Sequence, residues 1–330
     1  MRKLALFLLC LPAGLPALLP ASLPALAQET YPNRTVTLVT PYPPGGGSDF
    51  LTRILAEGLK TRLNQTVVVQ NISGAGGAVG SMQSAKAKPD GYTLLVNHIG
   101  MSTIPLLYKK FEFDPLQAYE FIGLFAEAPM IMLAGKDFAP KTFAELVAYA
   151  REKKERLTMA SSGMGSATHL CGMLFQEALG VQLTMVQYKG AGPALIDVRS
   201  GQVDLICDLP TTTSGMIRSG DLKAYVLTAP RRMTSLPDVP TAAEAGMPSL
   251  DIGVWYGFYA PKGTPRPIIE ILNKALREVV QDPSVAAQVE KVETYLLPLD
   301  AATPEAHRKK LVSQIELWRP IIEKAGIQAE

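Results

Sequence analysis

The sequence predicts an α/β protein built from two domains. The first observation is an apolar run at 36–39 that is typical of a buried strand, followed by a glycine-rich turn and by apolar residues at helical spacing from Phe50 to Leu63. The second is the return of this strand, turn and helix unit along the chain. The third is length: the 330 residues less a leader of 27 leave 303, which suits two domains.

An export signal is expected at residues 1–27. Arg2 and Lys3 precede an apolar run that ends in Ala25-Leu26-Ala27, a small-x-small cleavage pattern before Gln28. Prolines within the run argue against the alternative, a permanent membrane anchor. Without the leader, Lys plus Arg falls from 32 to 30 and balances 30 Asp plus Glu. The export signal predicts a periplasmic protein. Because the remaining chain is neutral and has no basic block, we expect it to bind no nucleic acid.

The first half of the chain is expected to alternate strands with helices. After the first unit come a strand, a glycine turn, a helix and a strand, at 66–70, 71–77, 82–86 and 92–96. This order implies a parallel sheet whose loops gather at one rim. The apolar passage 121–135, broken by Pro129, is interpreted as a strand that leaves the first domain and continues into the second.

The opening pattern returns in the second half of the chain. Strands are expected at 157–160, 183–187, 203–207, 222–228 and 252–260. Helices are expected at 142–154, 170–179, 194–199, 267–280, 283–293 and 304–325. Thr142-x-x-Glu145 matches a capping box, and the proline-punctuated stretch 230–248 favours irregular structure.

The turn Thr40–Asp49 is the strongest candidate for an anion site. Its three glycines let backbone N–H groups turn toward a guest, and Ser48 is the expected N-cap of the helix, whose start adds unsatisfied N–H groups. The turn is neither a Walker loop nor a dinucleotide fingerprint, because no Gly-Lys-Ser/Thr follows and Phe50 stands where a third glycine belongs. A carboxylate therefore fits better than a polyphosphate. The alternative is a tight connection that binds nothing.

The sequence does not indicate catalysis, a metal site or a cofactor. It has no Gly-x-Ser-x-Gly and three histidines: His98 at a strand end, His169 expected to be buried, and His307 expected on a solvated helix. No zinc-ligand spacing occurs. Cys171 and Cys207 can pair in an exported protein, although their apolar surroundings favour free, buried thiols.

Neutral hydrogen-bonding residues recur where the expected strands end. They are Ser48, Ser73, Ser161, Ser162, Ser166, Thr168, Thr211 and Thr213. Hydroxyls and backbone amides on two facing domains suit a small anion that is held without reacting. Asp49 and Asp208 occupy similar positions, where Asp usually caps a helix.

Ordered motifs extend from Tyr31-Pro32 to Trp318. They are Pro41-Tyr42-x-Pro44-Gly45-Gly46-x-x-Asp49, Asn71-x-x-Gly74-Ala75-x-Gly77, Pro89-Asp90-Gly91-Tyr92-Thr93-Leu94-Leu95, Gly165-Ser166-x-Thr168-His169-Leu170, Tyr188-Lys189-Gly190 with Pro193-Ala194, Gly201-x-Val203-Asp204, and Ala260-Pro261-x-Gly263-Thr264-Pro265. With these motifs the chain resembles the Bug-type (TctC-like) extracytoplasmic receptors, the substrate-binding components of tripartite tricarboxylate transporters.

The resemblance implies a periplasmic binding protein fold, with a ligand cleft between two α/β domains joined by two hinge crossings. The expected domains are 28–128 with 253–330, and 129–252. The resemblance implies a carboxylate ligand held at Tyr42, Gly45, Gly46, Gly47, Ser48, Asp49, Ser73, Gly74, Ala75, His98, Ser161, Ser162, Gly163, Ser166, Thr168, Tyr188, Gly190, Asp208 and Thr211. Met173, where relatives often carry Glu, and the threonine-rich run after Pro210 depart from the family pattern, so they bear on which ligand is bound.

The function expected from the resemblance is capture of a small carboxylate by a monomeric receptor that delivers it to membrane subunits of the transporter. The ligand classes considered are di- and tricarboxylates, acidic amino acids, and aromatic carboxylates such as terephthalate. An exported α/β hydrolase and a ligand sensor for a signalling system are the alternatives from other classes.

Overall fold

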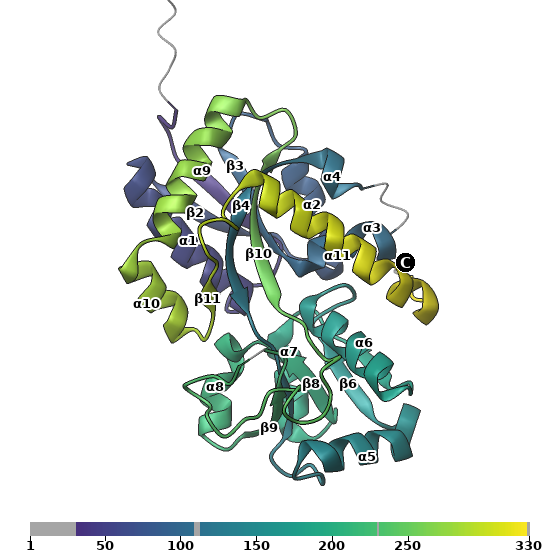
Figure 1. Cartoon of the computed structure of the whole chain (residues 1–330). Coiled ribbons are helices and arrows are strands. Elements are labelled where there is room, and N and C mark those ends of the chain that lie inside the picture. Colours follow the sequence, from purple (N-terminus) through teal and green to yellow (C-terminus); the bar gives the residue numbers. More distant parts are fainter. Residues whose placement is uncertain (1–30, 109–112, 230, 329–330) are drawn as a thin grey trace, which may run out of the picture. The chain divides into compact units, whose positions relative to one another are not determined.

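Two β-sheets with helices around them make up the described part of the chain. The computed structural model describes residues 31–108, 113–229 and 231–328, so the expected export signal and its cleavage site lie outside the described residues. The elements below all belong to one compact unit, Pro32–Glu330 (Figure 1). Within the described ranges, no helix combines the length and the apolar character needed to cross a membrane.

The first sheet has six strands in the order β11-β4-β10-β3-β1-β2. They are β1 (Val36–Thr40), β2 (Val67–Asn71), β3 (Thr93–His98), β4 (Tyr119–Ala128), β10 (Val254–Pro261) and β11 (Tyr295–Leu296). β1 pairs in parallel with β2 and β3, as the β-α-β order predicts. β10 runs antiparallel to β3 and β4, so the sheet is mixed rather than purely parallel.

The second sheet has five strands in the order β7-β6-β8-β5-β9. They are β5 (Ile131–Gly135), β6 (Thr158–Ser161), β7 (Thr184–Gln187), β8 (Leu205–Asp208) and β9 (Leu222–Leu227). β6 is parallel to β7 and β8, whereas β5 is antiparallel to β8 and β9. The parallel strands again bring their carboxyl ends, and the loops that follow them, to one edge.

Helices cover both sheets. They are α1 (Gly47–Leu63), α2 (Ala78–Ala85), α3 (Ile104–Leu107), α4 (Pro115–Ala118), α5 (Phe143–Lys153), α6 (Ala167–Leu179), α7 (Ala191–Ser200), α8 (Pro210–Arg218), α9 (Arg266–Val280), α10 (Pro283–Lys291) and α11 (Pro304–Ala325). The predicted capping box forms in part at the start of α5: the Thr142 hydroxyl accepts a hydrogen bond from the Glu145 N–H at 3.2 Å, while the Glu145 carboxylate accepts one from the Lys141 N–H at 2.7 Å rather than from Thr142. The run Thr211–Ser214 belongs to α8, a helix that was not expected from the sequence.

The chain passes between the two sheets in two places. It leaves the first sheet after β4 and enters the second with β5, and it returns between β9 and β10 (Figure 1). The Thr228 hydroxyl joins the two passages: it accepts a hydrogen bond from the Met130 N–H at 2.9 Å and donates one to the Ile252 carbonyl at 2.7 Å. One buried side chain therefore ties both connecting segments together.

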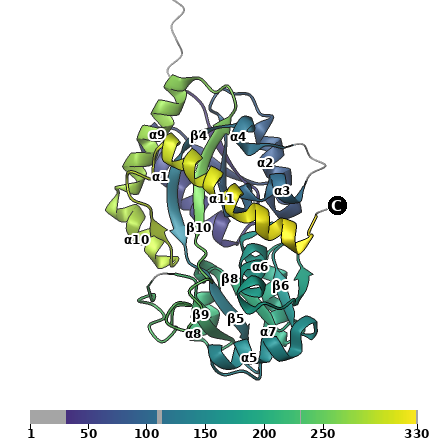
Figure 2. The ribbon, with the colours of Figure 1, turned by 45° about the vertical axis from the view of Figure 1, so that its right-hand side comes forward.

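His307 corrects an expectation from the sequence. It was expected on a solvated helix, but its side chain is fully buried. The helix that carries it, α11, packs on β4 and crosses the first sheet (Figure 2). The buried residues of α11 are His307, Leu311, Ile315, Trp318 and Ile322, whose spacing of three to four residues defines one helix face. Gly257 makes room for the imidazole, because a Cβ there would collide with its Nε2.

Candidate ligand-binding site

The starts of four helices surround one cavity of about 420 Å³. Its walls come from the beginnings of α1, α6, α7 and α8, and thus from loops of both sheets. The first N–H groups of a helix have no partner within the helix, and the helix dipole makes this end positive. The convergence of four such ends gives the cavity a preference for negative charge without any metal ion.

The loop before α1 is held in place by Asp49. The Asp49 carboxylate accepts hydrogen bonds from the Gly45 N–H, the Asn71 side chain and the Arg53 guanidinium, each at 3.0 Å. Burial alone would raise the pKa of Asp49, but these hydrogen bonds outweigh it and lower the pKa. Asp49 does not line the cavity, so it supports the loop from behind.

Gly46, and not Ser48, is the N-cap of α1. Gly46 has extended backbone angles (φ −86°, ψ 166°), whereas Ser48 already lies in the first helical turn. The helix therefore begins two residues earlier than expected, and Gly46, Gly47 and Ser48 all line the cavity. The prediction of an N-cap hydroxyl was wrong because the extended glycine begins the helix without one.

Two stacked rings line the cavity beside the α1 start. Tyr42 stacks on His98 with ring centroids 4.4 Å apart, and Tyr256 meets His98 edge-on at 5.8 Å. Burial lowers the pKa of His98 to about 3, so the imidazole is neutral. Its Nδ1 accepts a hydrogen bond from the Gly100 N–H at 2.9 Å, which assigns the proton to Nε2. His98 therefore offers an uncharged N–H donor.

The Thr168 hydroxyl organises the loop before α6. It accepts a hydrogen bond from the Ser162 N–H at 2.6 Å and lies 2.9 Å from the hydroxyls of both Ser162 and Ser166. Ser166 is the N-cap of α6, and its hydroxyl accepts from the His169 N–H at 3.4 Å. His169 is buried and accepts from the Gly165 N–H, as its expected structural role requires. Ser162 and Thr168 line the cavity, while Ser166 supports them.

Asp208 brings a buried carboxyl group to the cavity. It ends β8, is 2% exposed, and lies next to the start of α8. Burial raises its pKa to about 6, despite hydrogen bonds from the Leu209 N–H and the Thr212 hydroxyl. Nearby, the Thr211 hydroxyl oxygen is buried and has no hydrogen-bond partner within the described residues. Both groups retain hydrogen-bonding capacity that a ligand can use.

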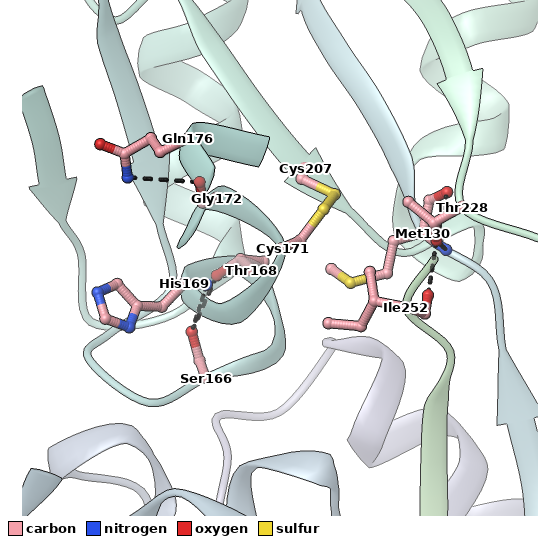
Figure 3. Close-up of a disulfide and its surroundings, with 10 residues drawn as sticks. All are labelled: Met130, Ser166, Thr168, His169, Cys171, Gly172, Gln176, Cys207, Thr228 and Ile252. Carbon is pink, nitrogen blue, oxygen red and sulfur yellow. Dashed lines mark hydrogen bonds between the residues drawn. A yellow bond between two sulfur atoms is a disulfide. The ribbon is translucent and has the colours of Figure 1, made fainter. Parts of the chain in front are cut away.

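A disulfide joins Cys171 to Cys207, with 6.0 Å between their Cα atoms (Figure 3). The sequence favoured free thiols, and this expectation was wrong because α6 packs on β8 and brings the two side chains together. Cys171 lies one turn after Thr168 on α6, and Cys207 directly precedes Asp208. The bridge therefore connects two walls of the cavity.

Many of the residues expected in the site do line the cavity. They are Tyr42, Gly45, Gly46, Gly47, Ser48, His98, Ser162, Thr168, Gly190, Asp208 and Thr211. Others lie behind the walls or in neighbouring loops: Asp49, Ser73, Gly74, Ala75, Ser161, Gly163, Ser166 and Tyr188. Ser161 and Tyr188 use their hydroxyls within the second sheet and its helices, donating to Gln187 and Asp197 respectively.

Several lining residues were not predicted. They are Pro43, Pro44, Phe50, Ala167, Lys189, Ala191, Gly192, Pro193, Leu195, Leu209, Thr212 and Met216. Most of them are sequence neighbours of predicted residues. Predicting complete turns, rather than single residues within them, would therefore have described the lining of the cavity better. Lys189 adds an exposed positive charge at the cavity, and Phe50, Leu195 and Met216 add apolar surface.

Metal ligation is not suggested by the described residues, because they contain no group of three or more His, Cys, Asp or Glu side chains arranged to hold an ion. The cavity walls instead offer main-chain N–H groups, hydroxyls, one imidazole N–H, one ammonium group and one carboxyl group. All of these groups except the carboxyl are donors that can bind a small anion by hydrogen bonds.

Comparison with known proteins identifies the family of this fold and site. Residues 51–327 match the tripartite tricarboxylate transporter family receptor, TctC. A protein of Agrobacterium vitis, described as the UPF0065 protein in the TAR-I ttuE-ttuC' intergenic region, is 40% identical over 300 residues, which are 91% of this chain and 87% of the relative.

Solved structures agree with this match. The periplasmic binding protein BugD superposes with a TM-score of 0.85 at 41% identity, covering 91% of this chain and 100% of BugD. MatC from Rhodopseudomonas palustris with bound malate has a TM-score of 0.83 at 34% identity, covering 88% of this chain and 100% of MatC. The protein has the fold of a periplasmic solute-binding receptor. It belongs to the tripartite tricarboxylate transporter receptor family, and the resemblance predicted from its motifs is confirmed.

Proposed function

We propose that this protein captures a small carboxylate in the cavity of about 420 Å³ and delivers it to the membrane subunits of a tripartite tricarboxylate transporter. The observation that carries the proposal is the convergence of the starts of α1, α6, α7 and α8 on that cavity. A carboxylate there accepts hydrogen bonds from main-chain N–H groups and from His98, and it neutralises the positive helix ends.

The comparisons support this proposal. The family is described as a receptor of tripartite tricarboxylate transporters, and the structural neighbour MatC holds malate. The cavity volume suits a small organic acid and is at the lower end of the range for ligand pockets. The ligand classes remain those expected from the sequence: di- and tricarboxylates, acidic amino acids, and aromatic carboxylates such as terephthalate. The disulfide is in keeping with export to the oxidising periplasm.

The two alternative functions, an exported hydrolase and a ligand sensor, predict a different fate for the ligand or a different membrane partner. A hydrolase would turn its ligand over, whereas a receptor releases it unchanged. A sensor would bind in the same way but would pass a signal to a different membrane partner. The receptor proposal also holds that the protein acts as a monomer without a cofactor.

Binding without turnover is the first testable prediction. Thermal-shift and calorimetric screening of succinate, malate, citrate, aspartate, glutamate and terephthalate is expected to find a ligand that raises the melting temperature, because ligand binding stabilises only the folded state. Mass spectrometry is expected to recover that ligand unchanged. A converted product would favour the hydrolase, and no stabilisation by any carboxylate would contradict the proposal.

Variants in the α1 loop test where the carboxylate is held. Ser48→Ala is expected to weaken binding roughly tenfold if its hydroxyl meets the ligand directly, since one charge-assisted hydrogen bond contributes about 1.5–3 kcal/mol. Gly46→Val is expected to do more damage by blocking the approach to the backbone N–H groups. Ser313→Ala, an exposed change on α11, is the matched control. Wild-type affinity in a folded Gly46→Val protein would mean that this loop is only a turn.

A further inference from the structure

The carboxyl group of Asp208 is not explained by a site that binds only anions. Asp208 is the one carboxylate among the described residues that line the cavity, and it is 2% exposed. A buried negative charge lowers the affinity of the cavity for a second negative charge placed beside it. The residue therefore acts against binding of a ligand that carries a carboxylate at this end.

Asp208 has no charged hydrogen-bond or ion-pair partner among the described residues. Its hydrogen-bond donors are the Leu209 N–H and the Thr212 hydroxyl at 3.2 Å, both uncharged. Within the described part of the chain, no Lys or Arg lies within ion-pair distance of it. The other titratable residues that line the cavity are the neutral His98, the neutral phenol of Tyr42, and the exposed Lys189. The phenol of Tyr256 on β10, which meets His98 edge-on, is neutral as well. A buried carboxylate without a cation is costly, and a ligand can supply the missing charge.

Asp208 also lies close to the start of α1. A Cβ on Gly47 would stand 2.5 Å from the Thr211 hydroxyl and 2.6 Å from the Leu209 side chain, so the starts of α1 and α8 are in contact. Burial raises the pKa of Tyr256, the charge of Asp208 raises it further, and the nearby Ser48 side chain lowers it. Ser48 and Asp208 thus both lie near the Tyr256 hydroxyl. A small ligand can meet the α1 start and Asp208 at the same time.

We propose that Asp208 is a specificity-determining residue that binds the protonated amine of the ligand, while the start of α1 holds a carboxylate of the same molecule. The ligand class is then a zwitterionic amino acid, and this inference rests on the proposed function of the site. A hydroxyl group would satisfy a lone pair of Asp208 but would leave its charge uncompensated. A second carboxylate would repel it. The Thr211 hydroxyl, which has no partner in the described structure, is a further acceptor for the amine.

Matched ligands test the proposal by calorimetry at pH 7.5. The amino acids L-aspartate, L-glutamate, L-leucine and L-phenylalanine are compared with the acids that lack the amine: succinate, glutarate, 4-methylpentanoate and 3-phenylpropanoate. L-malate replaces the amine of aspartate with a hydroxyl. We expect at least one amino acid to bind about 10- to 100-fold more tightly than its deaminated partner, in line with one charge-assisted pair. Asp208→Asn is expected to remove that preference and to improve the binding of the deaminated acids.

The outcomes separate this proposal from the function on which it rests. If deaminated acids or malate bind the wild-type protein as tightly as the amino acids, Asp208 does not select an amine, although the protein remains a carboxylate receptor. If the amine preference persists in a folded Asp208→Asn variant, another group recognises the amine and the proposal is wrong. If no carboxylate of either set binds, both proposals fail. The wild-type comparison decides the matter even if the variant does not fold.

Discussion

At the residue scale, the buried carboxyl of Asp208 makes stability depend on pH. Its pKa is about 6 in the folded chain, against an ordinary value of 3.8, because burial disfavours the charged form. Between these two values the folded state holds a proton that the unfolded state has lost. The free energy of unfolding therefore falls as the pH rises through this window, by about 3 kcal/mol for a shift of about two units.

This dependence gives a prediction for Asp208→Asn in the absence of ligand. The amide cannot ionise, so the variant should gain stability relative to wild type as the pH rises from 4 to 7, by about 3 kcal/mol. Urea unfolding at both ends of this range measures the difference. The pKa of Asp49 is lowered rather than raised, so Asp49 makes stability rise with pH, but this effect cancels because both proteins contain Asp49. A difference between the two proteins that stays constant with pH would show that Asp208 is not buried as described.

Some of these residues were accessible to sequence reasoning and others were not. Thr142 and Glu145 have a local hydrogen-bonding pattern, so their capping box could be predicted from spacing alone. Asp208 and His98 could be placed at strand ends, but their orientation depends on packing between distant segments. His307 was misjudged because polar neighbours along α11 concealed its position on the buried helix face. Ser48 was taken as the N-cap because its hydroxyl suits that position, yet Gly46 begins the helix.

At the element scale, most strands and helices follow the apolar periodicity of the sequence, and α8 is the instructive exception. Thr211, Thr212 and Thr213 are poor helix formers, so local preference does not indicate a helix here. Pro210 nevertheless fits the first position of a helix, and Thr213 and Ser214 are buried. Packing decides the conformation here. β10 was likewise predicted as a strand, but its antiparallel place between β3 and β4 is set by the return of the chain from the other sheet.

The link between α6 and β8 gives a prediction about the disulfide. Cys171 and Cys207 are 36 residues apart, and closing a loop of this length stabilises the chain by about 4 kcal/mol in the chain-entropy estimate. The double variant Cys171→Ala/Cys207→Ala is therefore expected to melt about 5–15 °C lower. It should also bind ligand more weakly, because the bridge connects segments that carry Thr168 and Asp208.

Alkylation and mass spectrometry provide the direct check on this bridge. The protein purified from the periplasm, denatured without reductant, should leave both cysteines unmodified by iodoacetamide, and reduction should add two labels. Two labels before reduction would mean that the cysteines are free, as their apolar surroundings in the sequence suggested. The double variant is the matched control, since it should take up no label under either condition.

At the scale of the whole chain, we propose that the two sheets mark the two domains expected from the sequence, 28–128 with 253–330 and 129–252. The two passages between them, joined by Thr228, would then form the hinge. Bonds between loops of the two sheets would belong to the closed arrangement: the Tyr108 hydroxyl donates to the Met164 carbonyl at 2.9 Å, and the Thr103 hydroxyl donates to the Gly165 carbonyl at 3.1 Å. Sequence could predict the two crossings, because the strands around them are strongly apolar. It could not predict these bonds, which depend on the positions of two separate loops.

The last prediction concerns closure around the ligand. Gly47 on α1 has no room for a side chain, because its Cβ would meet the Thr211 and Leu209 side chains at the start of α8. Gly47→Val should therefore hold the two domains apart, whereas Gly215→Val on α8, where no atom lies within 4 Å of the added Cβ, is the matched control. Small-angle scattering should show that ligand makes the wild-type protein and the control more compact. With ligand, Gly47→Val should keep the radius of gyration of the ligand-free protein. It should also bind the ligand at least tenfold more weakly than wild type, since it loses the contacts that favour the closed state. If a folded Gly47→Val protein becomes as compact as wild type with ligand, the contact between α1 and α8 does not limit closure. If ligand does not make the wild-type protein more compact, the hinge proposal is wrong.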